Sequence, residues 1–322
     1  MSKPDLLMVT PMMPMIEEQL DKAFTVHRLS AAKDRDALIA EVAPKVRAIA
    51  STPGARVDAA LMGKLPNLEI VGAFGVGYDS IDAKWAGEHG VVVTNTPDVL
   101  NEEVADTAIG LLLATIRQFP QADQYVRAGK WLEKAFPLTA TLQDRTVGVL
   151  GMGRIGKAIA KRLEAFNTPI VYHSRNPAAG VSYKHYPDLV AMARDVDVII
   201  VITPGGAATK HIVNKQVLEA LGPNGIVINV ARGSVIDENA LIDALRDKKI
   251  LSAGLDVFED EPKVPQALID MPHVVLLPHV GSASVHCRRL MGQLVVDNLI
   301  AWANGKAPLT PVAETPWPPK KK

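Results

Sequence analysis

The sequence predicts an α/β protein built from two doubly wound domains, each with a parallel sheet. Short β-branched segments alternate with helical patterns along most of the 322 residues, and this alternation is typical of parallel sheets covered by helices on both faces. The chain is 48% hydrophobic, which is enough to bury the cores of two ordinary domains. In its middle, a strand pattern, a glycine-rich turn and a helical pattern follow one another directly.

The first part of the chain, residues 5–95, contains strand patterns separated by helical patterns. The strand patterns are Leu6–Val9, Val46–Ala50, Leu68–Val71 and Val91–Val93, and the helical ones are Met15–Ala23, Arg35–Val42, Asp58–Lys64 and Ala83–Glu88. Asn95-Thr96-Pro97-Asp98 ends the alternation, because proline interrupts a sheet ladder and moves the residue before it out of helical conformation. We therefore expect residues 1–98, completed by residues 283–322, to form a flavodoxin-like domain.

A helical pattern from Glu102 to Arg117 is apolar on nearly all sides. Such a helix needs cover from several directions, because no side of it is suited to water. The cover can come from both domains or from a second subunit. An ordinary core helix within one chain fits the same pattern equally well.

Residues 99–282 are expected to form the second domain, which contains six strand patterns. They are Thr146–Leu150, Ile170–His173, Asp197–Val201, Ile226–Val230, Ala253–Val257 and Val274–Leu277. Helical patterns separate the later strands and end the chain, at Asp188–Arg194, Lys215–Leu221, Glu238–Asp247 and Ser284–Asn304. Six parallel strands are the number in a complete dinucleotide-binding domain of the Rossmann type.

The turn Gly151-Met152-Gly153-Arg154-Ile155-Gly156 follows the first of these strands and opens a helix. In this context, a G-x-G-x-x-G pattern predicts a dinucleotide site. The first glycine permits the tight turn, the second lets the backbone approach a pyrophosphate, and the third lets the helix pack closely on the strand. The N–H groups at the helix start, from Arg154 and Ile155 onward, are expected to face the phosphate charge.

The strand Ile170–His173 is followed by Ser174-Arg175-Asn176 and lacks the carboxylate that commonly binds the adenosine ribose hydroxyls. The Arg175 guanidinium could pair with a 2′-phosphate through two hydrogen bonds, with a hydroxyl and an amide beside it. This sequence therefore favours NADP over NAD as the cofactor. In the alternative interpretation Arg175 is a solvated surface charge, and the missing acid then has no explanation.

Three stretches place polar side chains at the carboxyl ends of later strands, where ligands bind in open α/β sheets. They are Val230–Ser234, Asp256–Pro262 and Pro278–Ser282. Reduction of a 2-keto acid needs a guanidinium that binds the carboxylate and polarises the carbonyl, and an imidazole, kept protonated by a carboxylate, that supplies a proton. These stretches contain that set. Taken singly, Arg232 could equally be a loop charge and His279 a strand-end histidine.

These motifs, with the glycine turn before them, resemble the D-isomer-specific 2-hydroxyacid dehydrogenase family over nearly the whole chain. Asn229–Gly233, Gly254–Pro262 and Pro278–Ser282 stand in that family's order. The resemblance implies three catalytic residues, Arg232, Glu261 and His279. In that assignment the histidine is the acid/base, and the glutamate is its partner.

The resemblance also implies residues that hold the cofactor and the substrate. Asp256 would bond the nicotinamide amide, and Thr203-Pro204 would lie along the adenosine. Ala231 and Gly281, which lie within the shared motifs, complete the expected cofactor contacts. The loop Phe74-Gly75-Val76-Gly77 would offer backbone N–H groups to the substrate carboxylate, an anion-binding use of glycine-rich backbone.

Within the family, the segment Arg145–Arg175 resembles the glyoxylate/hydroxypyruvate reductases. This likeness implies NADPH-dependent reduction of glyoxylate and hydroxypyruvate to glycolate and D-glycerate. One alternative is a reductase of aromatic 2-keto acids such as hydroxyphenylpyruvate, and another is a non-catalytic, nucleotide-sensing binding protein of the same fold. The complete set of arginine, glutamate and histidine favours an enzyme.

Composition favours a cytoplasmic protein, and the family resemblance implies that its partner is a small 2-keto acid. The 35 basic and 35 acidic side chains give zero formal net charge, so no electrostatic footprint for nucleic acid is present. No apolar run reaches membrane-spanning length, no signal-peptide core follows the N-terminus, and no metal site is expected. The single cysteine, Cys287, excludes an internal disulfide and fits a reducing compartment.

A homodimer is expected from the apolar helix and from Trp131. This tryptophan matches one that in related reductases reaches the neighbouring subunit's substrate site. Ordinary packing of Trp131 in an interface explains its presence equally well.

Overall fold

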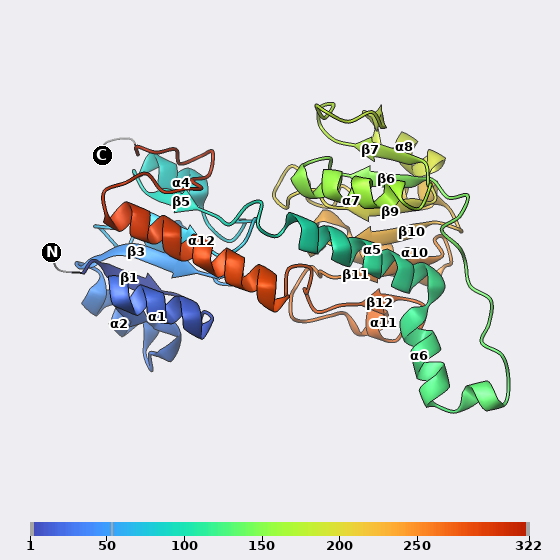
Figure 1. The fold of residues 1–322 in the computed structure, drawn as a ribbon, viewed down its shortest axis with the longest axis horizontal. Helices are drawn as coiled ribbons and strands as arrows, with labels where there is room; N and C mark the ends of the chain where they lie inside the picture. Colours follow the sequence, from blue (N-terminus) through green and yellow to red (C-terminus); the bar gives the residue numbers. More distant parts are fainter. Residues whose placement is uncertain (1–2, 53, 320–322) are drawn as a thin grey trace. The chain divides into compact units, whose positions relative to one another are not determined.

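The structure, a computed structural model, describes residues 3–52 and 54–319. These residues form two compact units (Figure 1). Unit 1 contains the described residues up to Leu100 and from Val285 onward, and unit 2 contains Asn101–Ser284. The predicted boundaries, after residues 98 and 282, each lie two residues earlier in the chain than these. Each unit contains one sheet of parallel strands, which confirms the predicted α/β class.

The sheet of unit 1 has five strands in the order β2-β1-β3-β4-β5. They are β1 (Asp5–Met8), β2 (Thr25–Arg28), β3 (Val46–Ser51), β4 (Ile70–Ala73) and β5 (Val92–Thr94). This is the flavodoxin-like order, with its reversal between β1 and β3. The sequence patterns do not predict β2, because this edge strand has no buried residue and so no apolar run.

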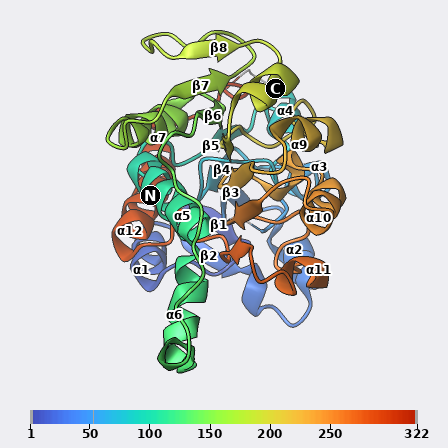
Figure 2. The same ribbon diagram turned by 90° about the vertical axis from the view of Figure 1, so that its right-hand side faces the viewer.

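Helices cover both faces of the first sheet. On one face, α1 (Pro14–Ala23) and α12 (Val285–Ala303) lie side by side (Figures 1 and 2). The other face is covered by the apolar sides of α2 (Arg35–Val42), α3 (Ala59–Met62) and α4 (Ala83–Glu88), with a 3-10 turn, η1, at Leu29–Ala31. Aspartates cap the N-termini of α2, α3 and α4, as is typical of helix starts.

The sheet of unit 2 has seven strands in the order β12-β11-β10-β9-β6-β7-β8. They are β6 (Val147–Leu150), β7 (Ile170–His173), β8 (Lys184–Tyr186), β9 (Val198–Val201), β10 (Ile226–Asn229), β11 (Ser252–Leu255) and β12 (Val275–Leu276). The order contains the Rossmann arrangement and reverses between β6 and β9. The strand missing from the prediction is β8, a short edge strand with one buried residue.

The helices of unit 2 also lie on both faces of its sheet (Figure 2). On one face, α5 (Asn101–Arg117) packs against α7 (Arg154–Glu164). The opposite face carries α8 (Leu189–Asp195), α9 (Lys215–Leu221) and α10 (Glu238–Arg246). The remaining helical segments are α6 (Phe119–Arg127), α11 (Gln266–Ile269) and the 3-10 turns η2 (Lys130–Leu132) and η3 (Gly233–Val235).

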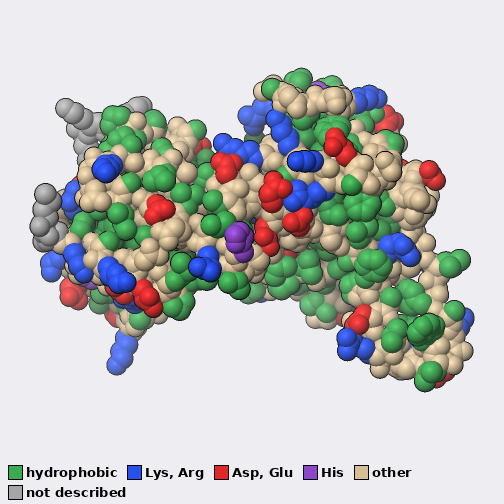
Figure 3. Space-filling view, in the orientation of Figure 1, with side chains coloured by type: hydrophobic (Ala, Val, Ile, Leu, Met, Phe, Trp, Pro, Cys, Tyr) green, Lys and Arg blue, Asp and Glu red, His purple; other side chains and the backbone are tan. Residues whose placement is uncertain are grey.

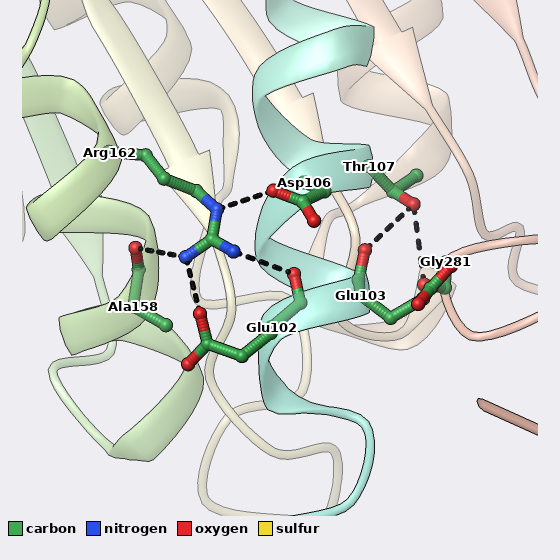
Figure 4. Close-up of polar contacts among 7 residues, drawn as sticks. All are labelled: Glu102, Glu103, Asp106, Thr107, Ala158, Arg162 and Gly281. Carbon is green, nitrogen blue, oxygen red and sulfur yellow. Dashed lines mark hydrogen bonds and ion pairs between the residues drawn. The ribbon is translucent and has the colours of Figure 1, made fainter. Parts of the chain in front are cut away.

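The apolar helix α5 is covered from within its own unit, so its burial requires no second subunit. It packs against α7, β10 and β11, and the close approach to β11 depends on Gly254, where a Cβ would lie 2.9 Å from the side chain of Leu111. Arg162 of α7 also bonds Asp106 at 2.6 Å and the Glu102 carboxylate at 2.8 Å (Figure 4). The sequence left open whether this helix is a core helix of one chain or is covered by a second subunit or by both domains. The contacts of α5 within unit 2 explain its buried surface as that of a core helix.

The segment 118–143, which we call the arm, leaves the body of unit 2 after α5 (Figure 1). Gln118 begins it in a left-handed conformation, with φ 51°. Helix α6 has no buried residue, and large apolar side chains gather on this segment (Figure 3), namely Phe119, Val126, Trp131, Leu132 and Leu138. Across the described residues, no helix is both long and apolar enough to span a membrane.

Candidate active site

The glycine turn joins β6 to α7 where the strand order of unit 2 reverses. Gly151 has φ 107°, and a Cβ there would lie 2.9 Å from the backbone N of Thr203, so a side chain would push away the loop after β9. A Cβ at Gly156 would collide with the carbonyl oxygen of Gly151. Gly153 has no atom within 4 Å of its Cβ position. The three glycines thus have the geometry expected for turn, ligand approach and helix packing.

The start of α7 is suited to an anion. Lys157 donates the first helical bond, to the carbonyl of Gly153 at 2.9 Å. The backbone N–H groups of residues 154–156 come before it and, as at any helix start, lie outside the helical hydrogen-bond ladder. The open backbone at Gly153 and these N–H groups fit a pyrophosphate, so this turn is suited to a dinucleotide.

The predicted phosphate residues Ser174-Arg175-Asn176 lie in a loop directly after β7, and Arg175 is exposed. The loop is held from two sides. His185 of β8 bonds the Ser174 carbonyl at 2.9 Å, and Lys157 of α7 donates to the carbonyl of Ala179 at 2.6 Å. Residues distant in sequence therefore present Arg175 to solvent on a fixed loop.

Arg232 follows β10 and is held through its backbone. Asn229 donates from Nδ2 to the Arg232 carbonyl and accepts from the N–H of Ala231, both at 3.0 Å. A Cβ at Gly233 would collide with the backbone of Phe258, so glycine lets this loop pack directly on the loop after β11. Asn229 and Gly233 had no role in the sequence prediction, although both belong to the motif that contains Arg232.

Glu261 and His279 form a direct pair. Oε2 of Glu261 lies 2.7 Å from Nδ1 of His279, and Oε1 accepts from the N–H of Phe258 at 3.1 Å. Burial by itself would raise the pKa of Glu261, but the hydrogen bonds from His279 and Phe258 and the positive charges of His279 and Arg232 leave this pKa below its usual value. The glutamate is therefore ionised at neutral pH.

Asp256 fixes the backbone around His279. Its buried carboxylate accepts from the N–H of Val280 at 2.7 Å and of Gly281 at 2.8 Å, and its carbonyl accepts from the N–H of His279 at 2.8 Å. Burial raises the pKa of Asp256, and the two backbone bonds oppose that rise. His279 has φ 55°, an unfavourable region for a residue with a side chain, and these three bonds hold it there.

Helix α5 also supports this loop. Thr107 donates to the carbonyl of Glu103 at 3.0 Å within the helix, and its hydroxyl lies 3.3 Å from the carbonyl of Gly281 (Figure 4). The sequence shows Thr107 only as a polar position in an apolar helix. The contact of Thr107 with Gly281 depends on tertiary packing and has no local signal.

In unit 1, the loop Phe74-Gly75-Val76-Gly77 follows β4, and its prediction needs a correction. The N–H of Phe74 donates to the Ser51 carbonyl at 2.8 Å, and that of Gly75 donates to Thr96 Oγ1 at 3.0 Å. These two N–H groups are already used, so they cannot bind a substrate carboxylate as expected. Among the described residues, the N–H groups of Val76 and Gly77 have no such bond and remain suited to an anion.

A second histidine–glutamate pair lies in unit 2 and was not predicted. His211 Nε2 lies 3.0 Å from Oε1 of Glu259, and His211 also has a positive φ, 52°. Here the glutamate comes from the same loop as Glu261. The sequence analysis named only the pair of Glu261 and His279, and the nearby charge of Arg232, which lowers the pKa of Glu261, distinguishes this pair from the second one.

A dinucleotide-type sheet with arginine, glutamate and histidine together at its strand ends defines a dinucleotide-dependent oxidoreductase. The chain belongs to the D-isomer-specific 2-hydroxyacid dehydrogenases, because residues 109–281 match the NAD-binding domain of that family. This confirms the resemblance drawn from the sequence motifs.

Similar proteins cover nearly the whole chain. The NADPH-dependent glyoxylate/hydroxypyruvate reductase of Sinorhizobium meliloti, solved with NADP and malonate, is 50% identical, with a TM-score of 0.93 and 100% of both chains covered. Glyoxylate/hydroxypyruvate reductase A of Arabidopsis thaliana is 47% identical over 95% of this chain and 98% of its own. Hydroxyphenylpyruvate reductase of Plectranthus scutellarioides is 45% identical over the same shares.

Proposed function

We propose that this protein uses NADPH to reduce glyoxylate and hydroxypyruvate to glycolate and D-glycerate. The observation that carries the proposal is the 2.7 Å pair of Glu261 and His279 at the strand ends of the dinucleotide-type sheet, within the electrostatic influence of Arg232. The relatives from Sinorhizobium meliloti and Arabidopsis thaliana, 50% and 47% identical, are named for these two substrates.

NADP, when bound in its reduced form, supplies a hydride from C4 of the nicotinamide ring. Arg232 binds the substrate carboxylate and stabilises the negative charge that develops on the carbonyl oxygen. Nδ1 of His279 is occupied by Glu261, so Nε2 donates the proton to that oxygen. The proton from His279, together with a hydride that the bound cofactor would supply to C2, would give the 2-hydroxy acid.

The residues that would hold NADP lie in the glycine turn, in the loop after β7 and at the strand ends. They are Gly151, Gly153, Arg154, Ile155, Gly156, Ser174, Arg175, Asn176, Thr203, Pro204, Ala231, Asp256 and Gly281. In unit 2 the substrate carboxylate is assigned to Arg232; in unit 1, the N–H groups of Val76 and Gly77 are available to an anion. The single cysteine is buried and unbridged, which supports a reducing cytoplasm as the location.

Steady-state kinetics with a panel of 2-keto acids test the proposal. NADPH oxidation with glyoxylate, hydroxypyruvate and hydroxyphenylpyruvate should give the highest kcat/KM with one of the first two. A preference for hydroxyphenylpyruvate would assign the protein to the aromatic reductases, an alternative favoured by the relative at 45% identity. NADPH binding without oxidation of the cofactor by any of the three would instead indicate a nucleotide-sensing protein.

Arg175→Ala should raise KM for NADPH by roughly ten- to a hundredfold and leave KM for NADH nearly unchanged. The reason is that only NADPH carries a 2′-phosphate to pair with this exposed guanidinium. Arg246→Ala is the control, because Arg246 lies in the same unit and pairs with Asp243 on the surface. Equal effects of Arg175→Ala on both cofactors would show that another group binds the phosphate.

Glu261→Gln should move the alkaline limb of kcat/KM for hydroxypyruvate to lower pH. Glutamine keeps a hydrogen-bond partner for His279 but removes the negative charge that favours the imidazolium, so the imidazole loses its proton at lower pH. The pH profile should be compared with that of Glu259→Gln, which changes the matched pair with His211. An alkaline limb that stays in place would exclude Glu261 as the electrostatic partner.

We further propose that the protein is a homodimer in which the arm contacts the second chain. Leu132 is 95% and Leu138 102% exposed, and clustered apolar side chains of this size mark interaction surfaces. Trp131, in η2, is 67% exposed. It could reach the partner's substrate site or pack in the interface, and both roles place it against the second chain.

Light scattering at micromolar concentration should therefore give the mass of a dimer. Introducing charge into the arm with Leu132→Asp and Leu138→Asp should shift the protein towards monomer, because the interface would bury two unpaired carboxylates. Leu309→Asp is the matched control, since Leu309 is 57% exposed but lies outside the arm. A monomeric wild-type protein would refute the dimer and with it any role for Trp131 across subunits.

A further inference from the structure

Arg288 lies on α12 and faces the loop Phe74–Gly77 of unit 1. Its guanidinium carbon is 5.4 Å from the centroid of the Phe74 ring, and Phe74 is itself buried. Gly292, one helical turn further on, lies on the same face of α12, and a Cβ there would be 3.7 Å from the Phe74 ring. The ring therefore fixes Arg288 beside the segment that contains the available N–H groups of Val76 and Gly77.

This guanidinium is half-buried and has no acidic partner. Burial lowers the pKa of Arg288, yet an arginine side chain keeps its proton at any physiological pH. Within residues 3–52 and 54–319, Arg288 forms no ion pair. A cation that is partly removed from water without a carboxylate is costly unless a ligand supplies the negative charge. The ring face of Phe74 offsets only part of that cost.

The remaining groups on the loop explain what such a ligand would be. Two backbone N–H groups, on Val76 and Gly77, match the two oxygens of one carboxylate. The Arg288 guanidinium adds donors in a planar fork, which suits a second carboxylate. On this loop, a keto acid with one carboxylate uses only the N–H groups of Val76 and Gly77. A keto acid with two carboxylates uses these N–H groups and the Arg288 guanidinium.

We infer that Arg288 is a specificity-determining residue that favours 2-keto acids with a second anionic group. This inference rests on the proposed reductase function and deepens it. The preferred class is that of small 2-keto dicarboxylates, which the family assignment does not by itself predict. Substrates with one carboxylate remain substrates, because their binding does not involve Arg288.

The test compares two acids of similar size that differ in charge, pyruvate and ketomalonate. Arg288→Met keeps an apolar stem against Phe74 and removes the charge. It should lower kcat/KM for ketomalonate by roughly ten- to a hundredfold and leave that for pyruvate within about twofold. Arg289→Met is the matched control, because Arg289 is the next residue on the same helix and is exposed. Arg288→Lys should restore part of the ketomalonate activity.

Equal loss with both substrates would overturn the inference, since it would mean that Arg288 only supports the fold of the loop. Failure of the wild-type protein to reduce any keto acid would instead contradict the proposed function. In that case, binding of malonate, measured by calorimetry on the wild-type protein and Arg288→Met, still tests Arg288. At least about tenfold weaker malonate binding by Arg288→Met, with acetate binding unaffected, would support the inference; equal malonate binding would refute it.

Discussion

Replacing His279 with alanine should lower kcat for hydroxypyruvate by roughly a hundred- to ten-thousandfold. In the proposed mechanism the variant loses the group whose Nε2 supplies the proton, while Arg232 remains to bind the substrate. The dissociation constant for NADPH, measured by fluorescence titration, should change little, because the residues proposed to hold the nucleotide lie mainly in the glycine turn and in the loop after β7. A large loss of kcat with unchanged NADPH binding therefore identifies a proton donor rather than a cofactor ligand.

His211→Ala provides an unusually close control for this experiment. His211 also pairs with a glutamate, at 3.0 Å, and also has a positive φ. Its loss should therefore disturb local structure about as much as the loss of His279, without removing the proton donor. If the two variants lost kcat equally, or if His279→Ala stayed active, the proton would have to come from another group.

Arg232→Met should lower kcat/KM for hydroxypyruvate by roughly a hundredfold or more. In the proposed mechanism the substrate carboxylate loses a charge-assisted pair, and the developing oxyanion loses the guanidinium that stabilises it. The same change removes one of the charges that lower the pKa of Glu261, so the pKa of that carboxyl should rise. The kinetic effect should appear in both KM and kcat, because the guanidinium acts on bound substrate and on the transition state.

Arg232→Lys separates the geometric contribution of Arg232 from its charge. Lysine keeps the positive charge but not the planar fork that matches a carboxylate, so recovery should be partial. Full recovery would mean that charge alone matters at this position. Unchanged kinetics in Arg232→Met would show that the carboxylate binds elsewhere and would remove Arg232 from the mechanism.

Much of the fold could be predicted from local sequence, because parallel strands buried on both faces are short apolar runs. The buried strands β6, β9 and β10 each consist of four buried residues and have clear patterns. The edge strands β2 and β8 were missed, since an edge position leaves side chains in water and no apolar run forms. Helix α6 was missed for a related reason, because it has no buried residue.

In the candidate site, too, some features could be predicted from the sequence and others could not. The glycine turn, Arg175, Arg232, Glu261 and His279 could be named from their motifs, because each lies at a strand end and strand ends of a parallel sheet meet at one edge. The family resemblance also named Glu261 as the partner of His279, whereas the pair of Glu259 and His211 had no signal in the sequence analysis. The two pairs are similarly exposed, and the charge of Arg232 near Glu261 distinguishes them.

The sequence by itself determined the class of fold, the dinucleotide turn and the chemical character of the strand-end residues, because these depend on short-range patterns. Only the tertiary structure decided how backbone donors are used. It assigns the N–H groups of Phe74 and Gly75 to Ser51 and Thr96, and those of Val280 and Gly281 to Asp256. A hydrogen bond between segments distant in the chain depends on where both segments lie after folding, and no local pattern specifies that position.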